Sequence, residues 1–144
     1  MKYLGLDLGT KSLGLAISDN QGLISLPFKV LKHNDDYPLL ISLLQDIIEN
    51  ENIERLVLGW PKNMNNTEGI RAQKTREFKE LLEKNIAIPV ELIDERLSSL
   101  QAEKYLIDNN MRRNKRKKVI DALAASIILE SFLERKKNEQ NTSK

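Results

Sequence analysis

The sequence contains no cysteine and a single histidine among its 144 residues. The absence of cysteine excludes disulfides, thiolate zinc sites and thiol nucleophiles, and it is typical of proteins from a reducing compartment. His33 is the one imidazole on which a Ser-His-Asp triad could be built. No apolar run approaches the ~20 residues of a membrane-spanning helix, and no signal peptide precedes the first strand-like run. These absences predict a cytoplasmic protein with no membrane partner.

Aromatic residues are also few, at 5%, whereas 40% of the residues are hydrophobic and 31% are charged. This composition is typical of an ordinary globular protein. The length suits one domain with a core of its own. We expect residues 1–136 to form that domain and the polar residues 137–144 to be frayed.

The net charge is only +2, but the charges are distributed unevenly along the chain. Residues 104–118 hold seven basic residues and one acid, Asp108, so the rest of the chain is mildly acidic. One dense basic stretch on an acidic body indicates a polyanionic partner that is held at one place.

Hydrophobic periodicity predicts the order of the elements. Three short apolar runs separated by turn residues predict an antiparallel meander, and Pro27 places the third strand at an edge. Right-handed crossovers then place two later strands parallel to the first. The result is an α/β protein with a mixed five-stranded sheet and helices on both faces, the topology of a ribonuclease-H-like fold. The predicted strands are 2–8, 13–18, 24–31, 55–58 and 90–93, and the predicted helices are 38–50, 67–84, 98–108 and 117–136.

Asp7 is the first residue that suggests chemistry, because it lies inside an otherwise apolar strand. An ionised carboxylate in a sheet core is costly unless it is paired or binds a metal. Gly5 and Gly9 on either side leave room for a ligand or for another backbone. The alternative is an aspartate that caps a turn at the end of the strand.

Further acids follow the last predicted strand and begin the last helix. Asp94 and Glu95 come directly after the apolar strand 90–93, where α/β sheets place their ligands. They are alternatively a surface acid pair with Arg96 as a partner. Asp121 shares a small, apolar helix face with Ala125, so it can be carried inward against the sheet. It is alternatively a first-turn acid that complements the helix dipole.

Together, carboxylates from two central strands and one helix can converge above the sheet. Carboxylates and water hold hard cations such as Mg²⁺ or Mn²⁺. Two such ions about 4 Å apart would polarise a water and stabilise the leaving oxygen of a phosphodiester. The acids therefore predict a metal-dependent nuclease that needs neither histidine nor cysteine.

The basic run 112–118 ends just before Asp121 and predicts a surface for phosphate groups, although an isolated charge run is usually a solvated loop. In the loop predicted after residue 59, Lys62 is a further phosphate contact, and Trp60 either stacks on a base or packs beneath the loop. We interpret His33 as an exposed loop residue with no role. The predicted nucleic-acid contacts are Lys11, Lys62, Arg96, Arg112, Arg113, Lys115, Arg116, Lys117 and Lys118.

Ordered motifs over about residues 2 to 134 carry a family resemblance. They contain Gly5, Asp7, Gly9, Lys11, Gly14, Ala16, Gly59, Pro61, Asn63, Thr67, Gly69, Asp94, Glu95, Arg96, Asp121, Ala124 and Ala125. The chain resembles the YqgF (RuvX-like) family, ribonuclease-H-like nucleases described as pre-16S ribosomal RNA nucleases or Holliday junction resolvases. The resemblance implies that Asp7, Glu95 and Asp121 are the catalytic acids, with Asp94 as a possible fourth ligand, and that the protein matures ribosomal RNA. The sequence departs from the family pattern at Trp60, Asn66, Ser98 and Ser99.

Several functions remain open at this point. The leading prediction is a metal-dependent nuclease acting on an rRNA precursor, as a monomer or a weak homodimer. The same acids could cut branched DNA, a reaction that usually needs a symmetric dimer. A noncatalytic nucleic-acid-binding module in transcription or ribosome assembly is a third hypothesis, which the retained acids disfavour. An ATPase lobe of the actin and sugar-kinase type is a fourth, but the chain is too short to close two lobes on a nucleotide.

Overall fold

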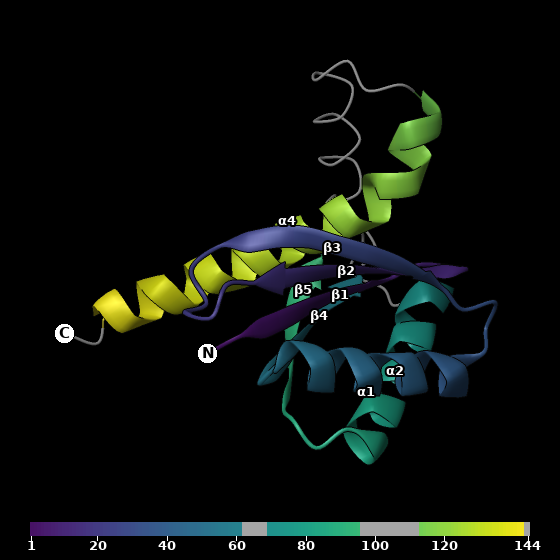
Figure 1. Cartoon of the computed structure of the whole chain (residues 1–144), viewed down its shortest axis with the longest axis horizontal. Helices are drawn as coiled ribbons and strands as arrows, with labels where there is room; N and C mark the ends of the chain where they lie inside the picture. The colour runs from purple at the N-terminus through teal and green to yellow at the C-terminus, as the bar shows by residue number, and fades with distance from the viewer. Residues whose placement is uncertain (62–68, 96–112, 143–144) are drawn as a thin grey trace.

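The computed structural model describes residues 1–61, 69–95 and 113–142, and at Pro61, Arg71, Glu95, residues 113–119 and residues 140–142 it describes the backbone alone. A five-stranded sheet lies at the centre, with helices against both of its faces (Figure 1). The strands are β1 (Tyr3–Leu8), β2 (Ser12–Ser18), β3 (Ser25–Lys32), β4 (Arg55–Pro61) and β5 (Val90–Glu95). The helices are α1 (Tyr37–Glu51), α2 (Ile70–Asn85) and α4 (Arg113–Thr142).

The strand order is β3-β2-β1-β4-β5. β1 pairs antiparallel with β2, and β2 pairs antiparallel with β3. β4 runs parallel to β1, and β5 runs parallel to β4. The predicted mixed sheet is therefore confirmed. β3 is an edge strand, as Pro27 indicated, and the β2–β3 ladder shifts register at Leu15/Ala16, next to that proline.

The two faces of the sheet pack against different helices. On one face Leu4, Leu6 and Leu8 of β1 belong to a core that is completed by α1 and α2. On the other face Tyr3 packs in a second core with residues of α4. Side chains alternate between the faces of a strand, so Gly5 and Asp7 share the face of Tyr3. The face covered by α4 is therefore the one that carries Asp7.

The helix α1 has clear local signals at both ends. Asp36 caps it by accepting a hydrogen bond from the Leu39 N–H at 3.2 Å, and Pro38 lies in the first turn. Asn52 ends it in the left-handed conformation with φ of 55°. The predicted helix 38–50, which was located from apolar spacing, agrees with this helix to within a residue at each end. In the described part of the chain, no helix has the length and apolar character needed to cross a membrane.

Several predicted boundaries were wrong. β4 continues beyond residue 58 to Pro61, and β5 continues beyond residue 93 to Glu95, because the two strands pair as far as the Pro61–Glu95 position. Asp94 and Glu95 thus belong to the strand instead of following it. α4 begins at Arg113 and not near residue 117, so most of the basic run is helical. The predicted cap Thr67 and the predicted helix 98–108 lie outside the described residues.

Candidate active site

Asp7 lies near the carboxyl end of β1 with only 3% of its surface exposed. Its neighbours Leu6 and Leu8 point into the core beneath α1 and α2, so Asp7 points toward α4. A carboxylate at such a position must be stabilised by polar partners or by a cation, because burial removes its hydration. The end of a central strand is also where open α/β sheets place their ligands.

Gly14 brings Asp121 to the strand pair that carries Asp7. It lies directly opposite Asp7 in the antiparallel ladder of β1 and β2. A Cβ atom at Gly14 would lie 2.0 Å from the backbone oxygen of Asp121 and 3.1 Å from its Cβ. Only glycine therefore lets α4 approach this closely. The fully buried Ala124 and Ala125 continue the same close packing along the helix.

Ser12 connects the start of β2 to the same acid. Its hydroxyl donates a hydrogen bond of 2.5 Å to Oδ2 of Asp121. The sequence indicated Ser12 only as a turn residue. One signal for a larger role was available: Ser12 is two residues from Gly14 in an alternating strand, so it shares the face of the sheet on which Asp121 packs.

On β5 the structure separates the two neighbouring acids. Ile93 packs in the core beneath α4, whereas Val90 and Leu92 pack against the opposite core. Asp94 is exposed and follows Ile93 directly, so it points away from the face of Asp7. Glu95 occupies the next position, opposite Pro61 in the β4–β5 ladder, and its side chain is outside the description. Among the described side chains, no group of three or more His, Cys, Asp or Glu is placed to hold a metal ion.

His33 was predicted to be exposed, and this was wrong, because it is only 2% exposed. Its Nδ1 accepts a hydrogen bond of 2.9 Å from the Asp35 N–H, which leaves Nε2 to donate to the Gly9 oxygen at 3.0 Å. Its backbone N–H donates to the Lys11 oxygen at 3.0 Å. Positive φ angles at Asn34 and Asp35 fold the polar loop around the ring. His33 therefore holds the β1–β2 turn that directly follows Asp7.

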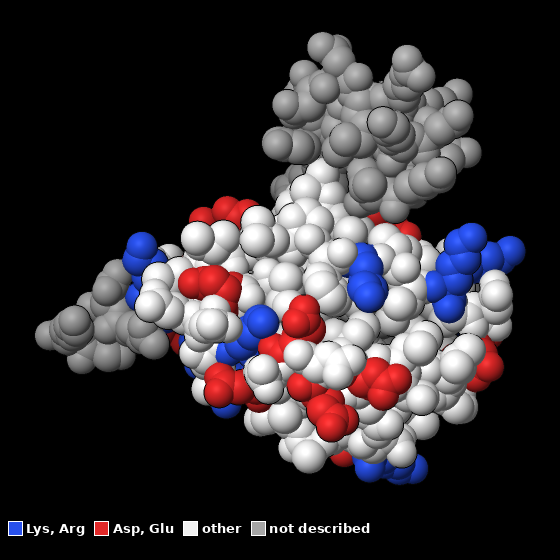
Figure 2. All heavy atoms as spheres, viewed as in Figure 1, with Lys and Arg blue, Asp and Glu red and all other residues white. Residues whose placement is uncertain are grey.

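The predicted cationic contacts are only partly visible. Lys11 is exposed in the β1–β2 turn. Lys62, Arg96 and Arg112 lie outside the described residues, and the basic residues from Arg113 to Lys118 form the first turns of α4. These turns stand away from the sheet, while the rest of the helix lies across it (Figure 1). On the face shown in Figure 2, acidic and basic side chains of the described residues lie among one another, without a single dominant sign.

A small hollow of about 230 Å³ lies at the end of β1 on the α2 side. Leu8, Gly9, Thr10, Ile70 and Lys74 line it. The Lys74 ammonium lies 3.4 Å from a carboxylate oxygen of Asp35. Lys74 is a cation near the candidate site that sequence reasoning missed, because α2 has no pattern that distinguishes it from other surface lysines.

Trp60 was predicted to lie in a loop, but it is the next-to-last residue of β4. Its ring lies 5.8 Å from the guanidinium carbon of Arg76 on α2. A cation–π contact of this kind is modestly stabilising at a partly exposed position. The contact places the Trp60 ring near α2.

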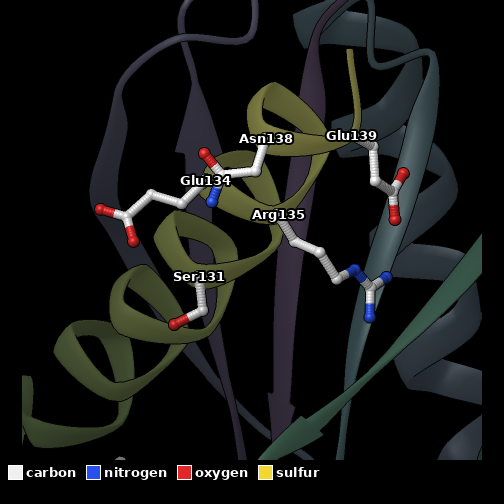
Figure 3. A pocket seen from close by; sticks show the side chains of 5 residues that line it. All are labelled: Ser131, Glu134, Arg135, Asn138 and Glu139. Atoms are coloured by element: carbon white, nitrogen blue, oxygen red, sulfur yellow. The ribbon is translucent and has the colours of Figure 1, made fainter. Parts of the chain in front are cut away.

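A second hollow lies on the last turns of α4, where Figure 3 shows Ser131, Glu134, Arg135, Asn138 and Glu139 around it. Phe132, at the same level of the helix, packs on Tyr3 with ring centroids 5.6 Å apart. Tyr3 begins β1 and Asp7 lies near its end, so this hollow is separate from the candidate site.

Comparisons with known proteins identify the family. Residues 1–135 match the RuvX family, whose model is described as Holliday junction resolvase. A relative from Bacillus subtilis, named "Putative pre-16S rRNA nuclease", is 46% identical over 137 residues, which cover 93% of this chain and 98% of the relative. A relative of the same name from Geobacillus kaustophilus is 44% identical over 140 residues, covering 95% and 100% of the two chains.

Solved structures confirm the fold. Thermus thermophilus RuvC in complex with a Holliday junction substrate has a TM-score of 0.59 at 15% identity, covering 94% of this chain and 95% of that chain. A second T. thermophilus RuvC structure has a TM-score of 0.55, also at 15% identity, covering 94% and 96%. At this identity the likeness shows the ribonuclease-H-like fold alone. The family match over residues 1–135 shows more: this chain is an enzyme that belongs to the RuvX family of nucleases.

Proposed function

We propose that this chain is a nuclease that depends on a divalent cation and cleaves phosphodiester bonds in structured RNA, with a precursor of 16S rRNA as its substrate. The observation that carries the proposal is the buried Asp7 at the end of β1, with Asp121 held against Gly14 directly opposite it. The substrate is inferred from the relatives, which carry that name at 46% and 44% identity over nearly the full length.

The proposed catalytic acids are Asp7, Glu95 and Asp121. Residues two apart in a strand share a face, so position 95 shares the face of Ile93, which packs beneath α4. Asp94 belongs to the opposite set. This alternation supports Glu95 as the third acid and makes Asp94 the weaker candidate for a ligand.

The donor set suits Mg²⁺ or Mn²⁺, because these hard ions prefer carboxylate oxygen and the site offers the buried Asp7 and, against Gly14 opposite it, Asp121 of α4. When bound, such ions would supply positive charge for activating a water and for stabilising the leaving oxygen. The protein's own contribution is to orient the acids. Asp7 is fixed in a central strand, and Asp121 is fixed by close packing of α4 and by Ser12.

The cations around these acids are proposed to bind the phosphate backbone of the substrate. Lys11 follows Asp7 in the β1–β2 turn, and the basic first turns of α4 lead directly into Asp121. Phosphate contacts give affinity without reading sequence. Lys62, Arg96 and Arg112 are proposed to extend this surface.

The decisive experiment incubates the purified protein with a labelled rRNA precursor and a four-way DNA junction, with Mg²⁺, with Mn²⁺ and with chelator. We expect the precursor to be cut only in the presence of metal. Asp7→Asn should lower the rate by about 10³-fold or more, because charge stabilisation by metal ions is worth several kcal/mol. Asp46→Asn, at an exposed acid of α1, is the matched control and should cut normally.

Cutting of branched DNA is the second candidate function, favoured by the description of the matching family model. Faster cleavage of the junction than of the precursor would select it. Binding of either substrate without cleavage under every metal condition would instead favour a noncatalytic module. Cleavage by Asp7→Asn at the wild-type rate would remove the proposed site.

A further inference from the structure

We propose that Ser12 is a positioning residue, whose hydroxyl holds the carboxylate of Asp121 in the orientation needed to bind a divalent cation together with Asp7. This inference rests on the proposed function, because it assigns Asp121 to the metal site. Ser12 would act through Asp121 and would not touch the substrate.

The contact itself is short and joins distant parts of the chain. The Ser12 hydroxyl lies 2.5 Å from Oδ2 of Asp121, across a sequence separation of 109 residues. Hydrogen bonds from a hydroxyl to an ionised carboxylate are shorter and stronger than those between neutral groups. A bond at Oδ2 fixes the plane of the carboxylate and so directs Oδ1, the other oxygen, toward a defined point.

The donor is well anchored, which is what a positioning role requires. The Ser12 backbone oxygen accepts a hydrogen bond of 2.8 Å from the Gly9 N–H, which closes the β1–β2 turn. His33 holds the same turn through Gly9 and Lys11. The Ser12 hydroxyl therefore projects from a rigid turn and not from a free loop.

The acid, by contrast, needs an external constraint. Close packing at Gly14 fixes the backbone and Cβ of Asp121, but the two side-chain torsions beyond Cα can still rotate. Asp121 is partly exposed, so burial alone does not fix its side chain. The hydrogen bond from Ser12 supplies this constraint.

A second serine provides a matched control. The Ser25 hydroxyl donates a hydrogen bond of 2.8 Å to the backbone oxygen of Ser126, so it also ties a strand to α4. Ser126 is more than one helical turn from Asp121, and this bond reaches no acid. Removing the Ser25 hydroxyl should cost a strand-to-helix bond without disturbing the carboxylate.

The experiment compares Ser12→Ala, Ser12→Thr and Ser25→Ala with the wild-type protein. Mn²⁺ binding is measured by titration calorimetry without substrate, and cleavage is measured over a range of Mg²⁺ concentrations. We expect Ser12→Ala to weaken Mn²⁺ binding and to raise the half-maximal Mg²⁺ concentration by about 10-fold, the usual effect of losing a partner that orients a ligand. Ser12→Thr keeps the hydroxyl and should restore both. Ser25→Ala should leave both unchanged.

Thermal melting of each variant separates positioning from folding, because a purely structural serine would lower the melting temperature without changing metal affinity. Wild-type Mn²⁺ affinity in a folded Ser12→Ala protein would overturn the proposal, as would equal losses of Mn²⁺ affinity in Ser12→Ala and Ser25→Ala.

The Asp7→Asn protein is titrated with Mn²⁺ in parallel. If it loses Mn²⁺ binding while Ser12→Ala does not, only the role of Ser12 is refuted. If Asp7→Asn itself binds Mn²⁺ and cleaves normally, the proposed function is refuted, and the role of Ser12 that rests on it is refuted as well.

Discussion

The two faces of the sheet are built from different kinds of residue. The face beneath α1 and α2 is packed with large aliphatic side chains that are completely buried, among them Leu4, Leu6, Leu15, Leu56 and Leu58. The face beneath α4 has small residues where the helix crosses the central strands. They are Gly5, Gly14, Ala16, Ala124 and Ala125.

The difference lies in how closely each helix layer approaches the sheet. Large side chains keep α1 and α2 at an ordinary packing distance and bury much apolar surface. Glycine and alanine let the backbone of α4 lie against the strands, as the approach of Asp121 to Gly14 shows. Under the proposed function, the small residues of the α4 face serve to place the acids.

Truncation on the leucine face should produce the largest loss of stability. Leu44 on α1 is completely buried, and Leu44→Ala should lower the free energy of unfolding by about 2–5 kcal/mol. Activity per folded molecule should be unchanged, because Leu44 is on the far side of the sheet from the acids. Urea denaturation and cleavage at a permissive temperature measure the two quantities. A specific loss of cleavage would mean that the faces are coupled.

Replacing glycines on the α4 face by alanine tests the opposite face of the sheet. Gly14→Ala places a methyl group against the Asp121 backbone and should cost about 1–3 kcal/mol together with most of the activity. Gly5→Ala is the companion variant. Its Cβ would meet the Leu129 Cβ at 2.9 Å, away from Asp121, so it should lower stability and leave cleavage nearly intact. Equal activity losses in the two variants would show that α4 moves as a rigid unit.

The basic first turns of α4 are proposed to bind the phosphate groups of the substrate. Replacing Arg112, Arg113, Arg116 and Lys117 with neutral residues should lower the salt slope of binding by about 0.7 to 0.9 for each phosphate group that is no longer neutralised. Turnover at saturating substrate should fall less than affinity, because the acids remain. Fluorescence anisotropy over a salt series measures the slope. An unchanged slope would move the phosphate surface elsewhere, with Lys11 and Lys62 as the next candidates.

Much of this architecture could be predicted because it is local. Alternation and helical spacing identified the order of the described elements, and Pro27 identified the edge strand. The strand ends were less predictable, because pairing between β4 and β5 carries the ladder through Trp60 to Pro61, residues whose composition indicated a loop. Neighbouring strands decided these ends, and local propensity did not.

The candidate site was less predictable than the fold, because more of it depends on contacts between distant residues. Asp7 stands out in the sequence because a charge in an apolar strand is anomalous. Gly14 stands out only through the family motif and Ser12 does not stand out, because the importance of both depends on contacts with Asp121 from the other end of the chain. His33 was wrongly predicted to be exposed, since its polar neighbours suggested solvent whereas its ring is enclosed by the turn that it stabilises.

Asp19 gives the smallest predicted effect and tests whether an acid away from the α4 contact is purely structural. Its Oδ1 accepts hydrogen bonds from the Leu23 N–H at 2.7 Å and the Ile24 N–H at 3.0 Å, within the turn between β2 and β3. These bonds, first that of Ile24 and then that of Leu23, lower the pKa of Asp19 below its usual 3.8. A carboxyl with a lowered pKa in the folded state stabilises the protein above its unfolded pKa, and this stabilisation is lost as the pH falls through the folded pKa. Asp19→Asn should therefore melt slightly below the wild-type protein at neutral pH, and the two melting temperatures should converge as the pH falls below about 4. Cleavage by the folded variant at neutral pH should equal that of the wild type.

A difference in melting temperature that stays constant down to the lowest pH would show that the charge of Asp19 contributes nothing to stability. A loss of cleavage would place this turn within reach of the substrate.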